Sequence, residues 1–203
     1  MGDSGMSFTE VGSLTALSSN QINVPSGHVI LGEAGSIVTP GSVIQTAFSR
    51  TDVRTSYYNY TQNDYVQSWT PIRQLQLRIK PLYASSAIFV KFVVNYEMEY
   101  NSIWNLLKDE QPFISTMNES YPRRWAGMCA TNYDMGDHSS TPNQLTMMWV
   151  DMPGSDQAQS YSPGFRRADG GGVTCWLNRT YSSSGQDSYE VGVSYGVAME
   201  IAQ

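Results

Sequence analysis

The clearest alternation of hydrophobic and polar positions lies within residues 72–100. Residues 75–80 alternate with a period of two, which is typical of a strand with one buried face and one solvent-facing face. Pro81 and the small residues 84–86 then predict a turn, because proline cannot donate to a sheet ladder. From Ala87 onward every even position is apolar, so the stretch predicts a hairpin whose second strand is central in a sheet.

The end of the chain carries a second alternating row, at residues 191–201. Bulky apolar residues occupy its odd positions, and this row is expected to complete the core beside the central strand. The even positions are almost bare of side chains, which lets another backbone approach closely, from this chain or from a neighbouring copy. The candidates for packing between copies in a trimer are therefore Gly192, Ser194, Gly196 and Ala198.

One short helix is predicted, within residues 101–119. Ser102 is a suitable N-cap, a group of apolar residues follows it on one side, and Pro112 would end the helix after a turn or two. Elsewhere the pattern predicts short strands separated by turn residues, at 125–130, 145–151, 160–167 and 173–178.

Eight to ten short antiparallel strands predict an all-β fold, namely an antiparallel β-sandwich that resembles a jelly roll. Residues 41–203 are long enough to form this sandwich as one domain. Residues 1–40 combine Gly, Ser and Thr with short apolar pieces and frequent turns, which favours an extended N-terminal docking arm with short strands.

Composition excludes several partners and compartments. The chain has 12 Lys and Arg against 18 Asp and Glu, a net charge of −6, and no long basic cluster, so nucleic acid is not an expected partner. No apolar run approaches the ~20 residues of a membrane span. The first residues lack the basic start and apolar core of a signal peptide. Two buried thiols are the favoured interpretation of Cys129 and Cys175, and one disulfide between them stays open.

Candidate catalytic and metal-binding chemistry is sparse. Asp134, Asp137 and His138 offer oxygen and nitrogen ligands and are the best, though weak, metal candidates. Their spacing matches neither a calcium-binding helix–loop–helix nor a nucleophile motif, so a polar loop is the preferred interpretation. We therefore expect no catalytic residue and no cofactor. Scattered loop carboxylates keep a polysaccharide-acting enzyme as an alternative.

Aromatic residues beside amide, hydroxyl and guanidinium groups are typical of recognition surfaces for sugars or proteins. Such groups occur in two regions and give the recognition or interface candidates Tyr57, Tyr58, Tyr60, Tyr121, Arg123, Arg124 and Trp125. From the residues alone, surface recognition, packing between subunits and packing within the chain all remain open.

An ordered series of short motifs runs through the second half of the chain. They are Asp151-Met152-Pro153-Gly154, Tyr161, Gly170-Gly171-Gly172, Leu177-Asn178-Arg179, Ser182-Ser183-Ser184 with Asp187, and Met199-Glu200-Ile201. Upstream, a Gly-Ser-Val-Ile-Gln strand at 41–45 precedes the stretch 69–94. In this order the motifs resemble a C-terminal domain of tailed-phage virion proteins, especially from phages of cyanobacteria and other aquatic bacteria. The resemblance covers residues 36–203.

This resemblance implies a non-enzymatic virion surface protein of the fibre, spike or capsid-decoration type, built as a homotrimer. The arm would bind other virion proteins, and the sandwich would trimerise and present loops to a host surface glycan or protein. The expected location is the virion, assembled in the host cytoplasm. A capsid decoration or cement protein is the alternative within the virion.

Overall fold

The structure is a computed structural model, and it describes most of the chain after residue 39. The described residues are 40–61, 69–98, 102–113, 117–118, 121–125, 127–130, 142–167, 171–181 and 190–203. They belong to one compact unit, Val38–Gln203. The predicted docking arm, residues 1–40, lies outside the described residues except for its last position, and the assignment of that arm stays a prediction.

Two antiparallel sheets make up most of this unit. Sheet A contains β1 (Val43–Thr51), β2 (Thr55–Thr61), β5 (Ala87–Met98), β11 (Asn143–Asp151), β13 (Gly171–Leu177) and β14 (Ser194–Ile201). Sheet B contains β3 (Thr70–Pro71), β4 (Leu77–Ile79), β6 (Ser102–Lys108), β7 (Gln111–Pro112), β10 (Cys129–Ala130) and β12 (Gln159–Arg167). A separate pair consists of β8 (Met117–Asn118) and β9 (Tyr121–Trp125).

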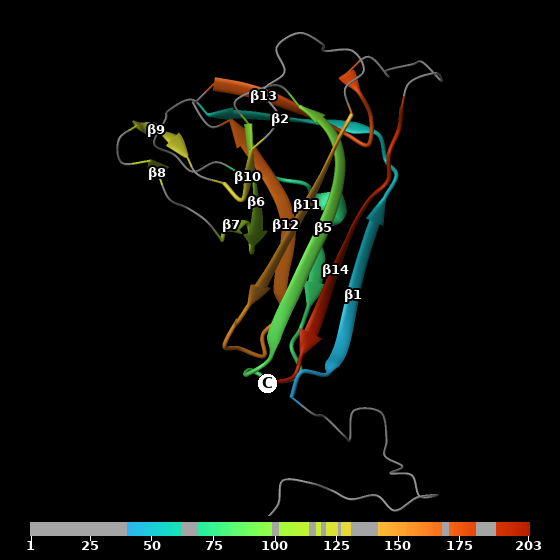
Figure 1. The fold of residues 1–203 in the computed structure, drawn as a ribbon, viewed down its shortest axis with the longest axis vertical. Helices are drawn as coiled ribbons and strands as arrows, with labels where there is room; N and C mark the ends of the chain where they lie inside the picture. The colour runs from blue at the N-terminus through green and yellow to red at the C-terminus, as the bar shows by residue number, and fades with distance from the viewer. Residues whose placement is uncertain are drawn as a thin grey trace, which may run out of the picture. The chain divides into compact units, whose positions relative to one another are not determined.

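The strand order is that of a jelly roll. In sheet A the strands lie in the order β1, β14, β5, β11, side by side in Figure 1, with β13 and β2 continuing the β14 and β1 positions. In sheet B the order is β4, β12, β6, β10. When only these eight strands are counted along the chain, the order is first, eighth, third and sixth in sheet A and second, seventh, fourth and fifth in sheet B. The predicted all-β sandwich is thus confirmed.

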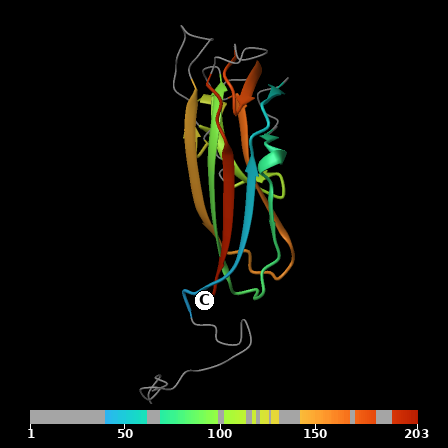
Figure 2. The same ribbon diagram turned by 90° about the vertical axis from the view of Figure 1, so that its right-hand side faces the viewer.

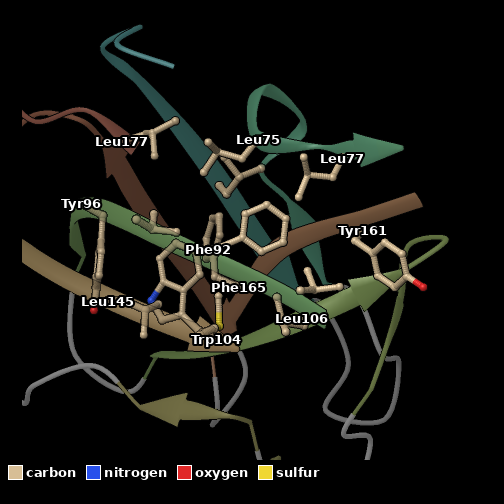
Figure 3. Close-up of a cluster of buried hydrophobic side chains, with 14 of the residues drawn as sticks. Leu75, Leu77, Phe92, Tyr96, Trp104, Leu106, Leu145, Tyr161, Phe165 and Leu177 are labelled. Atoms are coloured by element: carbon tan, nitrogen blue, oxygen red, sulfur yellow. The ribbon is translucent and has the colours of Figure 1, made fainter. Parts of the chain in front are cut away.

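The core lies between the sheets and is centred on aromatic side chains (Figure 3). The even positions of β5, including Phe92 and Tyr96, face sheet B as predicted. Trp104 of β6 is fully buried, with its ring 4.8 Å from that of Tyr96 and 5.5 Å from that of Phe165 on β12. Each such side chain contributes roughly 1.5–3 kcal/mol by burial, so this cluster holds the two sheets together.

The predicted hairpin within residues 72–100 is wrong, although its buried positions are right. Arg73–Leu75 forms a short 3₁₀ helix, η1, and only Leu77–Ile79 is a strand. That strand, β4, pairs with β12 in sheet B, whereas β5 begins at Ala87 in sheet A. Alternation identifies the buried side chains but not the pairing partner. The turn therefore carries the chain from one sheet to the other, and Figure 2 shows η1 and β4 beside β1.

The predicted helix within residues 101–119 is also wrong, because Ser102–Lys108 is strand β6. Its apolar side chains are buried on both faces, including Ile103 and Trp104. A short continuous apolar run fits a buried strand as well as a helix, and here tertiary packing decided. Asp109 and Glu110, with φ of 49° and 64°, make the tight turn into β7, where Pro112 pairs at the sheet edge.

Strand β14 has the opposite orientation to the one expected. Its side-chain-poor positions, including Ser194, Gly196 and Ala198, are buried and face the core, and its bulky odd positions face outward. Gly196 pairs directly with Phe92 of β5, and a Cβ added to it would lie 2.3 Å from Cε1 of that ring. The phenyl ring thus fills the space that a β14 side chain would need.

A buried carboxylate fixes the same orientation at the end of β14. Glu200 is fully buried. Its Oε1 accepts hydrogen bonds from the backbone N–H groups of Leu82 at 2.7 Å and Tyr83 at 3.2 Å, and its Oε2 accepts one at 2.6 Å from Nε2 of Gln45. Each charged hydrogen bond contributes about 1.5–3 kcal/mol, so the crossing turn is attached to sheet A.

We predict that Gly196→Ala lowers the free energy of unfolding by about 1–3 kcal/mol, because the new methyl group overlaps the Phe92 ring. Denaturant unfolding at fixed protein concentration measures the loss. Gly172→Ala is the control, since its Cβ meets only the far end of the exposed Tyr58 side chain. Equal stability of the Gly196→Ala variant and the wild type would contradict the packing described for β14.

Both cysteines are free thiols, Cys175 in the core and Cys129 half-buried on β10. Burial raises the pKa of each thiol and so disfavours the reactive thiolate. We predict that both react with a thiol reagent in denaturant without prior reduction, and that in the folded protein Cys129 reacts before Cys175. A single disulfide-linked species in the denaturant assay would refute this.

Candidate interaction surface

The outward orientation of β14 creates an apolar surface across sheet A, which we call the outer face. Strand register aligns its side chains in three rows that each cross four strands, because directly paired residues project to the same side. The rows are Thr46, Met199, Phe89 and Val150; then Phe48, Val197, Lys91 and Met148; then Arg50, Tyr195, Val93 and Thr146.

Several large side chains of the outer face are open to solvent. Phe48 on β1 is 65% exposed, and Met148 and Val150 on β11 are 54% and 52% exposed. Between them lie Val197 and Met199 of β14, which are half-buried by their neighbours. Isolated exposed hydrophobic residues are normal, but a contiguous apolar patch marks an interaction site. The outer face is therefore the strongest candidate functional surface in the described part of the chain.

The charges on the outer face have one sign. Arg50 is exposed on β1, and Lys91 is half-buried on β5, in the middle row. The twelve positions of the three rows include no acidic residue. A partner covering this surface must present apolar side chains and accommodate two cations.

The outer face is bounded on both sides by an edge strand of sheet A. Within the described residues, β1 pairs only with β14, and β11 pairs only with β5. The sequence of β11 contains no lysine, arginine or proline, which are the residues that commonly protect an exposed edge. The apolar surface thus runs to an edge that another chain can approach.

The residues predicted to pack between copies do not lie on this surface. Ser194, Gly196 and Ala198 are buried within the chain, and a Cβ added to Gly192 would lie 2.5 Å from Cβ of Asn95. The prediction that they contact a neighbouring copy is therefore corrected, since residues of the same chain already occupy their side. The row of β14 that the sequence predicts in the core is the one that faces outward.

The aromatic recognition candidates on β2 divide between its two faces. Tyr57 packs against the core, and desolvation raises the pKa of its hydroxyl group. Tyr58 points the other way and is 63% exposed. Tyr60 lies on the same strand, but its side chain is outside the described atoms. Of these three tyrosines, only Tyr58 is thus shown to be exposed.

The second group of recognition candidates lies in a different sheet. Tyr121, Arg123, Arg124 and Trp125 belong to β9, which pairs with β8, and only their backbone is described. The structure places the two groups on separate sheets, β2 in sheet A and β9 in the small pair.

The candidate metal ligands Asp134, Asp137 and His138 lie outside the described residues. Among the residues that are described, no three His, Cys, Asp or Glu side chains gather where they would hold a metal ion. No helix in that same part of the chain is long and apolar enough to cross a membrane. Asp151 is engaged structurally, accepting a 2.6 Å hydrogen bond from the Tyr161 hydroxyl and lying 2.8 Å from Nζ of Lys108.

A small pocket of about 240 Å³ opens beside β5 and β11. Its lining includes Asn95, Gln144 and Arg179, whose polar groups are used within the chain. The Gln144 amide donates to Oδ1 of Asn95 at 3.1 Å, and the Arg179 guanidinium donates to the Tyr181 carbonyl at 3.0 Å. This pocket is smaller than typical ligand sites of ~300–1,000 Å³ and is less developed than the outer face.

Comparison with known proteins assigns no family to the chain. No protein-family model matches it, and no curated protein matches it. Among solved structures, one similar chain is a mutant VP2 protein of infectious bursal disease virus, from derived T=1 particles. That similarity has a TM-score of 0.32 and 10% sequence identity, and covers 86% of this chain but 41% of VP2. A similarity this low carries no argument about function.

We predict that Tyr57→Ala and Tyr58→Ala separate the two roles on β2. Loss of the core-packed Tyr57 ring should lower the free energy of unfolding by about 2 kcal/mol. Loss of the exposed Tyr58 ring should change it by less than about 0.5 kcal/mol. Denaturant unfolding of the two variants checks this, and equal losses would contradict the assigned orientations.

Proposed function

We propose that this protein is a non-enzymatic structural component of a virus particle, a homotrimeric fibre or spike protein displayed for fibre attachment or host adhesion. The observation that carries the proposal is the exposed apolar outer face of sheet A, with Phe48, Met148 and Val150 at its two margins. Such a surface suits a subunit that works in an assembly.

Two further observations support a virion rather than another kind of assembly. Jelly rolls are common in viral capsid and lectin domains, although a fold alone does not assign a function. The motifs across residues 36–203 resemble a domain of tailed-phage virion proteins, and this resemblance supplies the viral context. Together they favour a structural protein that forms contacts with other subunits and presents its loops to a partner.

In this proposal the chain has three kinds of partner. It contacts itself in the trimer, it contacts other virion proteins through residues 1–40, and its exposed aromatic residues, such as Tyr58, meet a host glycan or protein. Three copies on one particle raise avidity by ~10²–10⁴ over a single site, provided that they can bind together. The proposal involves no cofactor, no nucleic acid and no membrane insertion.

Imaging of tagged virions tests the proposal. A tag that leaves the chain functional should be detected on purified particles, and we predict label at the tail or fibre tips. Particles lacking the protein should then fail to adsorb to cells while remaining intact. Label spread over the head, with particles that become fragile when the protein is removed, would instead identify a decoration protein. Absence of the protein from purified virions would overturn the proposal.

A further inference from the structure

The outer face has the dimensions of a protein contact. Its four strands, about 4.8 Å apart, and the five positions of β14 from Tyr195 to Met199, rising about 3.4 Å each, span roughly 300 Å² in projection. This is the lower end of the ~300–600 Å² of the largest patches on monomers, which are often functional. Accessible area exceeds projected area, so the face can form the apolar centre of a protein contact.

The charge of the outer face disfavours a contact with the same face of another copy. A twofold contact is self-complementary, so it would place two Lys91 and two Arg50 side chains in one apolar layer. No acid on the face would separate these like charges, which destabilises such a layer. Face-to-face pairing about a twofold axis is therefore the wrong geometry for this surface.

A different surface of a second copy has the complementary charge. With Arg50 and Lys91 set aside, the rest of the chain holds 18 acidic residues against 10 basic ones. Exposed acids lie outside the face in the described residues, among them Asp52 after β1 and Asp156 after β11. An identical chain can thus offer what the face lacks, provided that it docks with another side.

We infer that the outer face of sheet A binds a different surface of a second copy of this chain, and that the copies close into a ring through this heterologous contact. The occupant is an acid-bearing surface of the neighbour, which covers Phe48, Met148 and Val150 and meets Lys91. The inference rests on the proposed function in one respect, because the trimer gives the ring its three members. A heterologous contact closes when each copy is rotated equally from the last.

Light scattering of the full chain tests the contact. Val150→Asp places an acid against the acid-bearing surface of the neighbour and should convert the wild-type trimer to monomer at micromolar concentration, a loss of at least tenfold in affinity. Leu82→Asp is the matched control, because Leu82 is 58% exposed but lies in the turn before β5, off the outer face. It should leave the trimer unchanged. A wild-type monomer, or a trimer that survives Val150→Asp, would overturn the inference.

Zero-length cross-linking identifies the occupant. Lys91 should be joined to a carboxylate of residues 41–203, and in a mixture of isotopically light and heavy chains the cross-link should join the two kinds. A link to Asp3, Glu10 or Glu33 would show that the N-terminal segment is the occupant and overturn the assignment. In the light-scattering experiment, a mass of two chains would overturn the heterologous geometry, because a ring of three needs three chains. The localisation experiment is independent, since a monomer found on virions would defeat this inference and the trimer, and would leave the proposed location and role in the virus particle standing.

Discussion

The packing of Phe92 over Gly196 is the contact on which the rest of the described structure depends. The ring belongs to β5, which pairs with β11 on one side and with β14 and β13 on the other. Because the ring needs the space above the glycine, β14 must present its small residues to the core. The bulky residues of β14 then have only the outer side available. One steric requirement inside the sandwich thus determines the chemistry of its surface.

Polar groups reinforce this orientation at both ends of β14. At one end the buried carboxylate of Glu200 accepts backbone N–H groups from the turn that joins the sheets. At the other end the Ser194 hydroxyl donates to Oδ1 of Asn178, whose own side-chain amide donates to the carbonyl of Thr51. A shift of β14 by one residue in its pairing would move these polar groups to the outside of the sheet. Their partners would then be left without hydrogen bonds. Register is thus fixed by groups that contribute little hydrophobic burial.

The sequence predicted much of the fold because β5 has a strongly apolar even row, and because turn residues bound the short strands β11 and β12. It failed at β14 because alternation separates two faces but does not say which is inside, and here the more apolar face is outside. Gly196 and Glu200 were the available signals, since a glycine between bulky neighbours indicates close packing and a lone acid in an apolar strand indicates a buried acceptor. The prediction of a helix at β6 failed because a short apolar run is compatible with either a helix or a strand.

The position of β14 between β1 and β5 has a consequence for synthesis of the protein. The outer face combines residues from position 46 to position 199, so it does not exist until β14 has been made and inserted. Contacts this distant in sequence form late, since loop closure must precede them. A chain that has not yet inserted β14 therefore lacks the complete outer face. The order of the strands thus sets when this surface forms.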